Sequence, residues 1–163
     1  MTTAIVEFSV PGVPVGQPRP RAQLVRGKAR PFVHMYTPGE RVKPWKDLIG
    51  LHFARHQPAE PWTGPVKLSL EAFFPRPQRL LKRTSPSGAL WMSAKPDLDN
   101  VLKAVMDALT WSEDRRRGLW RDDAQVVAYG PTGKWYAAIG CEPGIRVRCE
   151  LLEQREELFP CSC

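Results

Sequence analysis

Residues 66–74 read VKLSLEAFF, and an apolar side chain occupies every second position of this stretch. Successive side chains of an extended chain point to opposite faces, so these apolar side chains would share one face. They are Val66, Leu68, Leu70, Ala72 and Phe74. The stretch is therefore predicted to be a strand that packs one face on the core, and the rest of the chain must supply its neighbours.

Further strands and two helices are predicted around this strand. Alternating stretches predict strands within residues 3–12, 32–36, 124–130, 133–140 and 144–153, with a Pro-Thr-Gly turn between the third and the fourth. One helix is expected to begin at Pro44, and a second to run from about Asn100 to Trp111, because apolar side chains recur there at helical spacing. The sequence thus predicts an α+β fold in a single small domain, residues 1–163. Its sheet would be mixed or antiparallel, with four to six strands and two main helices.

The composition is typical of a soluble globular protein, with 42% hydrophobic and 25% charged residues in a chain of 163. No apolar run approaches the ~18 residues that cross a bilayer, and the first dozen residues lack the pattern of a signal peptide. Four cysteines match no zinc-binding pattern and are expected to be reduced thiols: Cys141, Cys149, Cys161 and Cys163. We therefore expect a cytoplasmic protein without a membrane partner, whose tail, residues 154–163, is flexible.

Charge is unevenly distributed along the chain. Residues 1–95 contain 15 Lys and Arg against 5 Asp and Glu, whereas residues 96–163 contain 9 against 12. Two proline-rich basic stretches, 13–31 and 75–96, are predicted to be loops, the second long and mobile. Their side chains are candidates for contacts with DNA phosphates: Arg19, Arg21, Arg26, Lys28, Arg30, Arg76, Arg79, Lys82 and Arg83. A basic protein without a nucleic-acid partner is the alternative.

Acidic residues cluster at the start of the second helix, in KPDLDNVLKAVMDAL (95–109), and again in WRDDAQVV (120–127). Asp97 is expected in the approach loop and Asp99 near the N-cap, because Pro96 disfavours a helix that starts earlier. An N-cap aspartate stabilises a helix by ~1 kcal/mol, so a structural role is one interpretation. The N-cap interpretation explains only one of the two aspartates. A Mg²⁺ site explains both, because Mg²⁺ binds carboxylate oxygens and an extended Asp-x-Asp points both side chains the same way.

Two further groups could complete such a site. Asp122 and Asp123 precede a predicted strand, in which only one of two consecutive side chains can face the helix. Lys103 lies four residues after Asp99, and Asp107 four residues after Lys103, so they share one helix face. Lys103 is either a surface ion-pair partner or a cation that stabilises charge building on a phosphate. The residues alone leave a metal-dependent phosphodiesterase and a structural helix start as alternatives.

The same stretches resemble the RusA family of Holliday junction resolvases, a group of phage and prophage endonucleases. The resemblance rests on DLDN followed by Lys103, on DDAQ after a linker, and on the opening FSVPGVPVGQPRPRA (8–22). It implies that Mg²⁺, with Mn²⁺ as a substitute, is bound by Asp97, Asp99 and Asp123. It also implies that Lys103 is catalytic and that Asp122 is an acidic neighbour of lesser importance. The loop 75–96 and the CSC tail have no counterpart in the family pattern.

The family further implies a homodimer that cuts two strands of a four-way DNA junction symmetrically, leaving 5′-phosphate and 3′-hydroxyl ends. A C₂ dimer would match the near two-fold symmetry of a junction. The leading interpretation is therefore a Mg²⁺-dependent endodeoxyribonuclease of DNA recombination and repair, in the cytoplasm of a bacterium or an infected host. A less selective phage nuclease for branched DNA and a non-cleaving DNA-binding protein are the alternatives. Trp91 and Phe32 are expected to be buried, with insertion into the junction centre as the other interpretation.

Overall fold

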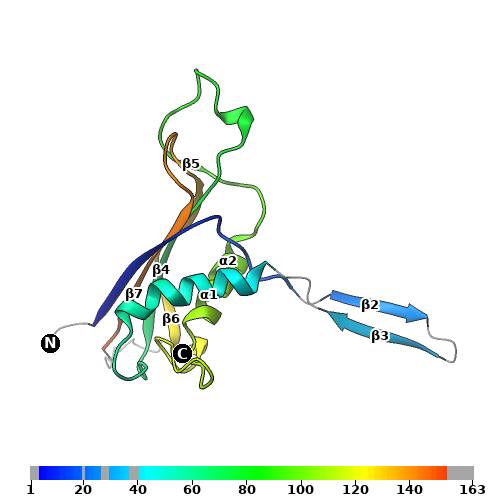
Figure 1. Ribbon diagram of the computed structural model, residues 1–163, viewed down its shortest axis with the longest axis vertical. Helices are drawn as coiled ribbons and strands as arrows, with labels where there is room; N and C mark the ends of the chain where they lie inside the picture. Colours follow the sequence, from blue (N-terminus) through cyan, green and yellow to red (C-terminus); the bar gives the residue numbers. More distant parts are fainter. Residues whose placement is uncertain (1–3, 20, 27–29, 37–40, 154–163) are drawn as a thin grey trace, which may run out of the picture.

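Two α-helices lie on one side of a five-stranded sheet, and a two-stranded hairpin projects from this body (Figure 1). The computed structural model describes residues 4–19, 21–26, 30–36 and 41–153. The arrangement confirms the α+β fold with two main helices that the sequence predicts. No helix within these ranges is long and apolar enough to cross a membrane.

The large sheet is mixed. Its strands lie in the order β1 (Ile5–Pro11), β7 (Gly144–Leu151), β4 (Val66–Phe74), β6 (Val126–Tyr136) and β5 (Leu90–Trp91). Within the described sheet β4 and β6 run parallel, and the other neighbouring pairs are antiparallel. A parallel pair needs a long crossover, and this one contains β5, a helix and the second acidic pair.

The predicted strand β4 is confirmed, and it lies at the centre of the sheet. Its apolar face is at most 4% exposed. The same face of the sheet carries the buried side chains of β1 and β7, among them Phe8 and Val147. Both helices lie on this side, so the hydrophobic core is a single layer between helices and sheet (Figure 1). The opposite face of the sheet is covered by no described helix.

The helices α1 (Val42–Phe53) and α2 (Leu98–Leu109) each begin two residues before the predicted start. Pro44 is therefore the third residue of α1, still within the first turn, where its missing N–H costs no hydrogen bond. The apolar stripe of α2 divides into two parts. Val101, Val105 and Leu109 are fully buried, whereas Leu102 and Met106 are only partly buried beside the core.

The strand β6 is continuous where the sequence predicts two strands and a turn. The Pro-Thr-Gly turn predicted at residues 131–133 is wrong, because β6 runs through it from Val126 to Tyr136. Where β6 passes Ser69 of β4, Gly130 and Pro131 oppose that single residue. A bulge tolerates proline because the ladder is already interrupted there.

The sequence predicts a loop over the whole basic stretch 13–31, but part of this stretch forms a strand. β2 (Arg21–Arg26) pairs antiparallel with β3 (Pro31–Tyr36) in a separate two-stranded sheet. The strand predicted at 32–36 is confirmed, but the loop prediction is wrong for β2. The six residues of β2 include no proline, so each has a backbone N–H that can donate a hydrogen bond. The hairpin extends away from the body near the start of α1 (Figure 1).

The long basic loop 75–96 contains the 3₁₀ turn η2 (Gln78–Leu80) and the edge strand β5. Arg76 ties its base, because the guanidinium donates hydrogen bonds to the carbonyl oxygens of Ala137, at 3.0 Å, and Pro86, at 2.6 Å. Trp91 in β5 is 75% exposed and Phe32 in β3 is 54% exposed. The expectation that both aromatic side chains are buried is wrong.

A close crossing of the chain brings the second acidic pair beside α2. The amide of Leu119 donates to the carbonyl oxygen of Leu109 at 2.7 Å, and the amide of Trp111 to that of Trp120 at 2.7 Å. Gly118 lies at the closest approach, because a Cβ there would be 2.3 Å from the Cα of Trp111. Glycine therefore lets the segment pass, and the crossing determines where the following residues lie relative to α2.

Replacing Gly118 with alanine should destabilise the protein, because the added methyl group would overlap the backbone of Trp111. Forced overpacking lowers the free energy of unfolding by ~1–3 kcal/mol. Gly88→Ala is the matched control, since a Cβ there meets nothing within 4 Å, and its change should stay within ~0.5 kcal/mol. Urea denaturation measures both variants. Equal stabilities would contradict the close approach at Gly118.

Candidate active site

The first turn of α2 holds two of the predicted acids. Asp97, rather than Asp99, occupies the N-cap position, in extended conformation (φ −67°, ψ 147°). Its carboxylate accepts no capping hydrogen bond from the described residues, so capping does not explain why an aspartate stands there. Asp99 lies within the helix. The two carboxylates therefore do not share the direction that an extended Asp-x-Asp segment would give them, although negative charge at this helix end is favourable for both.

The N-terminal loop packs across the start of α2 and brings a cation to Asp99. The amide of Gln17 donates to the carbonyl oxygen of Asn100 at 2.7 Å. Two residues later, Nη2 of Arg19 is 2.5 Å from Oδ2 of Asp99. The hydrogen bond from Arg19 lowers the pKa of the Asp99 carboxyl group, which is therefore ionised at neutral pH. A predicted phosphate-binding arginine is thus ion-paired with a predicted metal ligand.

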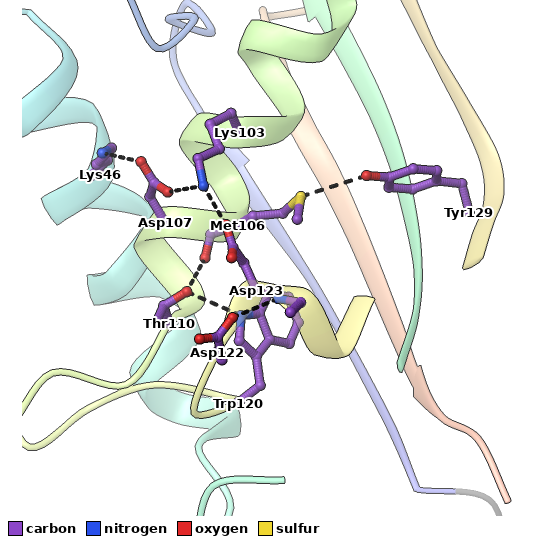
Figure 2. A network of polar contacts seen from close by, with 10 residues as sticks. Lys46, Lys103, Met106, Asp107, Thr110, Trp120, Asp122, Asp123 and Tyr129 are labelled. Atoms are coloured by element: carbon purple, nitrogen blue, oxygen red, sulfur yellow. Dashed lines mark hydrogen bonds and ion pairs between the residues drawn. The ribbon is translucent and has the colours of Figure 1, made fainter. Parts of the chain in front are cut away.

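Lys103 lies between two carboxylates (Figure 2). Its Nζ donates a hydrogen bond to Oδ2 of Asp123 and is 3.1 Å from Oδ1 of Asp107, one turn further along α2. Lys46 of α1 binds the other oxygen of Asp107 at 2.7 Å. The hydrogen bonds to Asp123 and then to Asp107 raise the pKa of Lys103, so its ammonium group is charged at neutral pH. Lys103 is therefore held from two elements, and is not the surface partner of Asp99 that the spacing permits.

The consecutive acids Asp122 and Asp123 have different roles at the start of the 3₁₀ helix η3 (Asp123–Gln125). Asp122 is the N-cap: its Oδ1 accepts from the amide of Ala124 at 2.8 Å, and its own amide donates to Oε1 of Gln125 at 3.1 Å. The side-chain amide of Gln125 also donates to the carbonyl oxygen of Trp62 at 2.8 Å. One acid thus caps η3 while the other faces α2. Only one of these two consecutive acids faces α2, as expected, but the segment is a 3₁₀ turn rather than a strand.

Trp120 attaches this segment to the end of α2. Its side chain is fully buried, and its Nε1 donates to Oγ1 of Thr110 at 3.2 Å. The Thr110 hydroxyl in turn donates to the carbonyl oxygen of Met106 at 2.9 Å (Figure 2). Asp123 therefore follows an anchored tryptophan, and its distance from Lys103 depends on that anchor.

A pocket of about 380 Å³ collects most of the predicted catalytic residues. It is lined by Asp99, Leu102, Lys103, Met106, Asp123, Ala124 and Tyr129. Tyr129 comes from β6 and is half-exposed, with its hydroxyl 3.7 Å from the sulfur of Met106 (Figure 2). The partly buried side of the α2 stripe thus forms the apolar wall of a pocket whose other wall carries two carboxylates and an ammonium group.

Asp97 borders a second pocket, of about 490 Å³, at the same turn of α2. Gln17 also lines it, and its side-chain oxygen is buried without a hydrogen-bond partner in the described part of the chain. Arg19 lines this pocket and binds Asp99 of the first one, so the ion pair lies between the two. The described residues contain no group of three or more His, Cys, Asp or Glu that could hold a metal ion. Metal binding by Asp97, Asp99 and Asp123 stays a prediction.

The predicted phosphate-binding residues fall into three groups. Five are exposed on the hairpin and on the long loop: Arg26, Arg30, Arg79, Lys82 and Arg83. Arg19 and Arg76 are engaged within the protein, with Asp99 and with backbone carbonyl groups. Arg21 begins β2, while Lys28 and the tail 154–163, with Cys161 and Cys163, lie outside the described residues. Cys141 and Cys149 are free thiols.

Sequence reasoning did not identify three residues of this site. Lys46 and Tyr129 approach from α1 and β6, and no spacing in the sequence relates them to α2. Gln125 could have been found, because Asp122-x-x-Gln125 has the spacing of a capping box. That signal would also have assigned Asp122 to structure and left Asp123 as the acid that faces the pocket.

Comparison with known proteins adds two findings. Residues 11–150 match the family described as Endodeoxyribonuclease RusA. The chain is also 35% identical over 127 residues to a protein of Bacillus subtilis (strain 168) named Uncharacterized protein YqaN, a match that covers 75% of this chain and 82% of that protein. The family match includes every residue that lines the two pockets.

Asp122→Ala should lower the free energy of unfolding by ~1 kcal/mol, the usual cost of removing an N-cap side chain. Asp114→Ala removes an exposed aspartate from the turn after α2, and its free energy of unfolding should change by less than ~0.5 kcal/mol. Urea denaturation of both variants measures the difference. If Asp122→Ala is as stable as Asp114→Ala, the cap of η3 contributes nothing and Asp122 has another role.

Proposed function

Because the chain belongs to the RusA endodeoxyribonuclease family, we propose that it is a Mg²⁺-dependent nuclease that resolves Holliday junctions by paired, symmetric nicks. The position of Lys103 carries the proposal. Its ammonium group is fixed beside Asp123 in a pocket that Asp99 also borders. A lysine that only stabilised α2 would need no partner from η3. In this position, Lys103 places positive charge where a phosphate bound among these groups would be cleaved.

Asp97, Asp99 and Asp123 are the residues that would hold Mg²⁺. Their carboxylate oxygens are the hard donors that Mg²⁺ prefers, and the unpartnered oxygen of Gln17, in the pocket of Asp97, is a further donor of this kind. Asp99 is paired with Arg19 and Asp123 with Lys103, so both carboxylates lie beside a cation in the described structure. When bound, Mg²⁺ supplies a Lewis acid at the scissile phosphate and lowers the pKa of water.

Lys103 would stabilise the negative charge that builds on the phosphate during cleavage. Because its pKa is raised, it stays protonated and does not act as a general base at neutral pH. Asp123 and Asp107 hold the ammonium group in place, and Lys46 compensates part of the charge of Asp107. The chain therefore contributes electrostatic stabilisation and orientation.

The DNA would contact the basic side chains that the fold leaves exposed. The hairpin presents Arg26 and Arg30, and the long loop presents Arg79, Lys82 and Arg83. These residues would bind phosphates without reading the sequence of bases. The substrate has near two-fold symmetry, so two copies related by a C₂ axis would bring one pocket to each of the two strands that are nicked.

Cleavage of a synthetic four-way junction, compared with a linear duplex in Mg²⁺ and in EDTA, tests the proposal. We expect the junction to be cut in Mg²⁺ and neither substrate to be cut in EDTA. Asp99→Asn should bind the junction and not cut it, because it removes a ligand charge with little change of shape. Cleavage of both substrates would indicate a less selective nuclease, and binding without cleavage a DNA-binding protein. Near wild-type cleavage by Asp99→Asn would show that this carboxylate holds no metal ion.

Lys103→Ala should fold, bind junctions and cut on the order of a hundredfold more slowly, measured in single-turnover experiments with saturating enzyme. Lys103→Arg should recover little, because a planar guanidinium group replaces a compact ammonium group between two carboxylates. Lys67→Ala is the matched control, since it removes a lysine that pairs with Glu150 on the opposite face of the sheet. Cleavage by Lys103→Ala within about threefold of wild type would remove Lys103 from the mechanism.

The double variant Arg26→Ala/Arg30→Ala should bind all DNA more weakly and flatten the salt dependence of binding. If each arginine contacts one phosphate, the slope of log affinity against log salt falls by about 2. Arg55→Ala, an exposed arginine beyond the far end of α1, should leave the slope unchanged. Fluorescence anisotropy over a salt series measures the slopes. An unchanged slope in the double variant would place the DNA away from the hairpin.

A further inference from the structure

Four side chains form a stacked row on the open face of the sheet. Trp91, Trp135, Phe73 and Arg146 come from the adjacent strands β5, β6, β4 and β7. The ring centroids of Trp91 and Trp135 are 4.7 Å apart with an interplanar angle of 29°, and those of Trp135 and Phe73 are 5.6 Å apart at 25°. The guanidinium group of Arg146 lies 5.3 Å from the centroid of Phe73. This set is called the aromatic row below.

The outer end of the aromatic row is open. Trp135 stacks on one side of Trp91, yet Trp91 is 75% exposed, so the other face of its ring is in solvent. Arg146 closes the inner end over Phe73. An exposed indole face is rarely retained for packing alone, because burying it would be favourable. One more flat ring stacked on Trp91 would extend the row in its own direction.

The charges around the aromatic row favour a polyanion. Trp91 lies within the loop 75–96, in which every charged side chain is basic. Three acids of the open face, one each on β1, β4 and β7, are paired with arginines. Glu71 is 3.8 Å from Arg146, and Glu7 and Glu150 both bind Arg148. A ligand that offers flat rings together with negative charge is a single-stranded nucleic acid.

A short segment connects the aromatic row to the candidate active site. The amide of Met92 donates to the carbonyl oxygen of Lys134 at 3.1 Å, and Nζ of Lys134 donates to the carbonyl oxygen of Pro96 at 2.7 Å. Trp91 precedes Asp97 by six residues, a span of at most ~22 Å in a fully extended chain. The segment is pinned to β6 at both ends. A strand that leaves a branch point could therefore reach the pocket and the row together.

We propose that the aromatic row binds unpaired bases of the branched DNA substrate, with one base stacked on the open face of Trp91 and its phosphates on the basic loop. The inference deepens the proposed function and rests on it for the identity of the substrate. Stacking tolerates any base, because each base has a flat face. Bases within a duplex already stack on one another, so the row distinguishes frayed or unpaired DNA at a branch from intact duplex.

The test measures affinity for a labelled oligothymidine strand and for a duplex of equal length, by anisotropy in EDTA with the full chain. Trp91→Ala should weaken binding of the single strand by roughly 5- to 150-fold, the range for one base–aromatic contact, and change duplex binding little. Trp91→Phe keeps a flat ring and should recover most of the affinity. Leu81→Ala removes an exposed apolar side chain from the same loop and should change neither affinity.

Three results would overturn the assignment. The first is an unchanged affinity of Trp91→Ala for the single strand, and the second is an equal loss for strand and duplex. The third is a dimer of the wild-type chain that dissociates in Trp91→Ala without DNA, seen by sedimentation velocity, which would make the row an interface between copies. The binding assay contains no metal ion and requires no cleavage. Base binding by the aromatic row can therefore be shown even if the protein cleaves no DNA. Nuclease activity can likewise be shown even if the row binds no base.

Discussion

The candidate site depends on the attachment of residues 118–125 to the end of α2. Two backbone hydrogen bonds, a buried tryptophan side chain and a glycine at close approach hold this attachment. The cap of η3 then turns Asp123 towards Lys103. From there charges alternate in sign through Asp107 to Lys46, so that one chain of ion pairs joins η3, α2 and α1. Three of the acids that a basic protein concentrates here, Asp99, Asp107 and Asp123, thus each have a cation beside them.

The parallel pairing of β4 with β6 explains why the site lies where it does. Parallel neighbours cannot be joined by a tight turn, so the chain must leave the sheet after β4 and return at the start of β6. That crossover contains α2 and η3, and with them Asp97, Asp99, Lys103 and Asp123. Residues from outside the crossover, Arg19 and Lys46, reach the site only because the N-terminal loop and α1 pack on α2. The topology therefore gathers the acids in a single excursion of the chain.

The two faces of the sheet have different chemistry. The helix-covered face is apolar and continuous, and its edge forms the wall of the candidate active-site pocket. The open face carries paired charges and the aromatic row, with the bulge at Ser69 between β4 and β6. The long basic loop joins the two, since it leaves from β4, adds β5 to the sheet edge and ends at Asp97.

The sequence by itself determined the elements whose signals are local. β4 follows from its two-residue alternation and α2 from its apolar stripe, and the spacing of Asp99 and Lys103 places both on one face of α2. The sequence could not determine that Asp123 pairs with Lys103, that Arg19 pairs with Asp99, or that Trp91 is exposed in a stacked row. These contacts join residues that lie far apart in the chain, and a parallel crossover, a bulge and a close passage at Gly118 set their distances. Periodicity records which way a side chain points within its own element, but only packing decides what it meets.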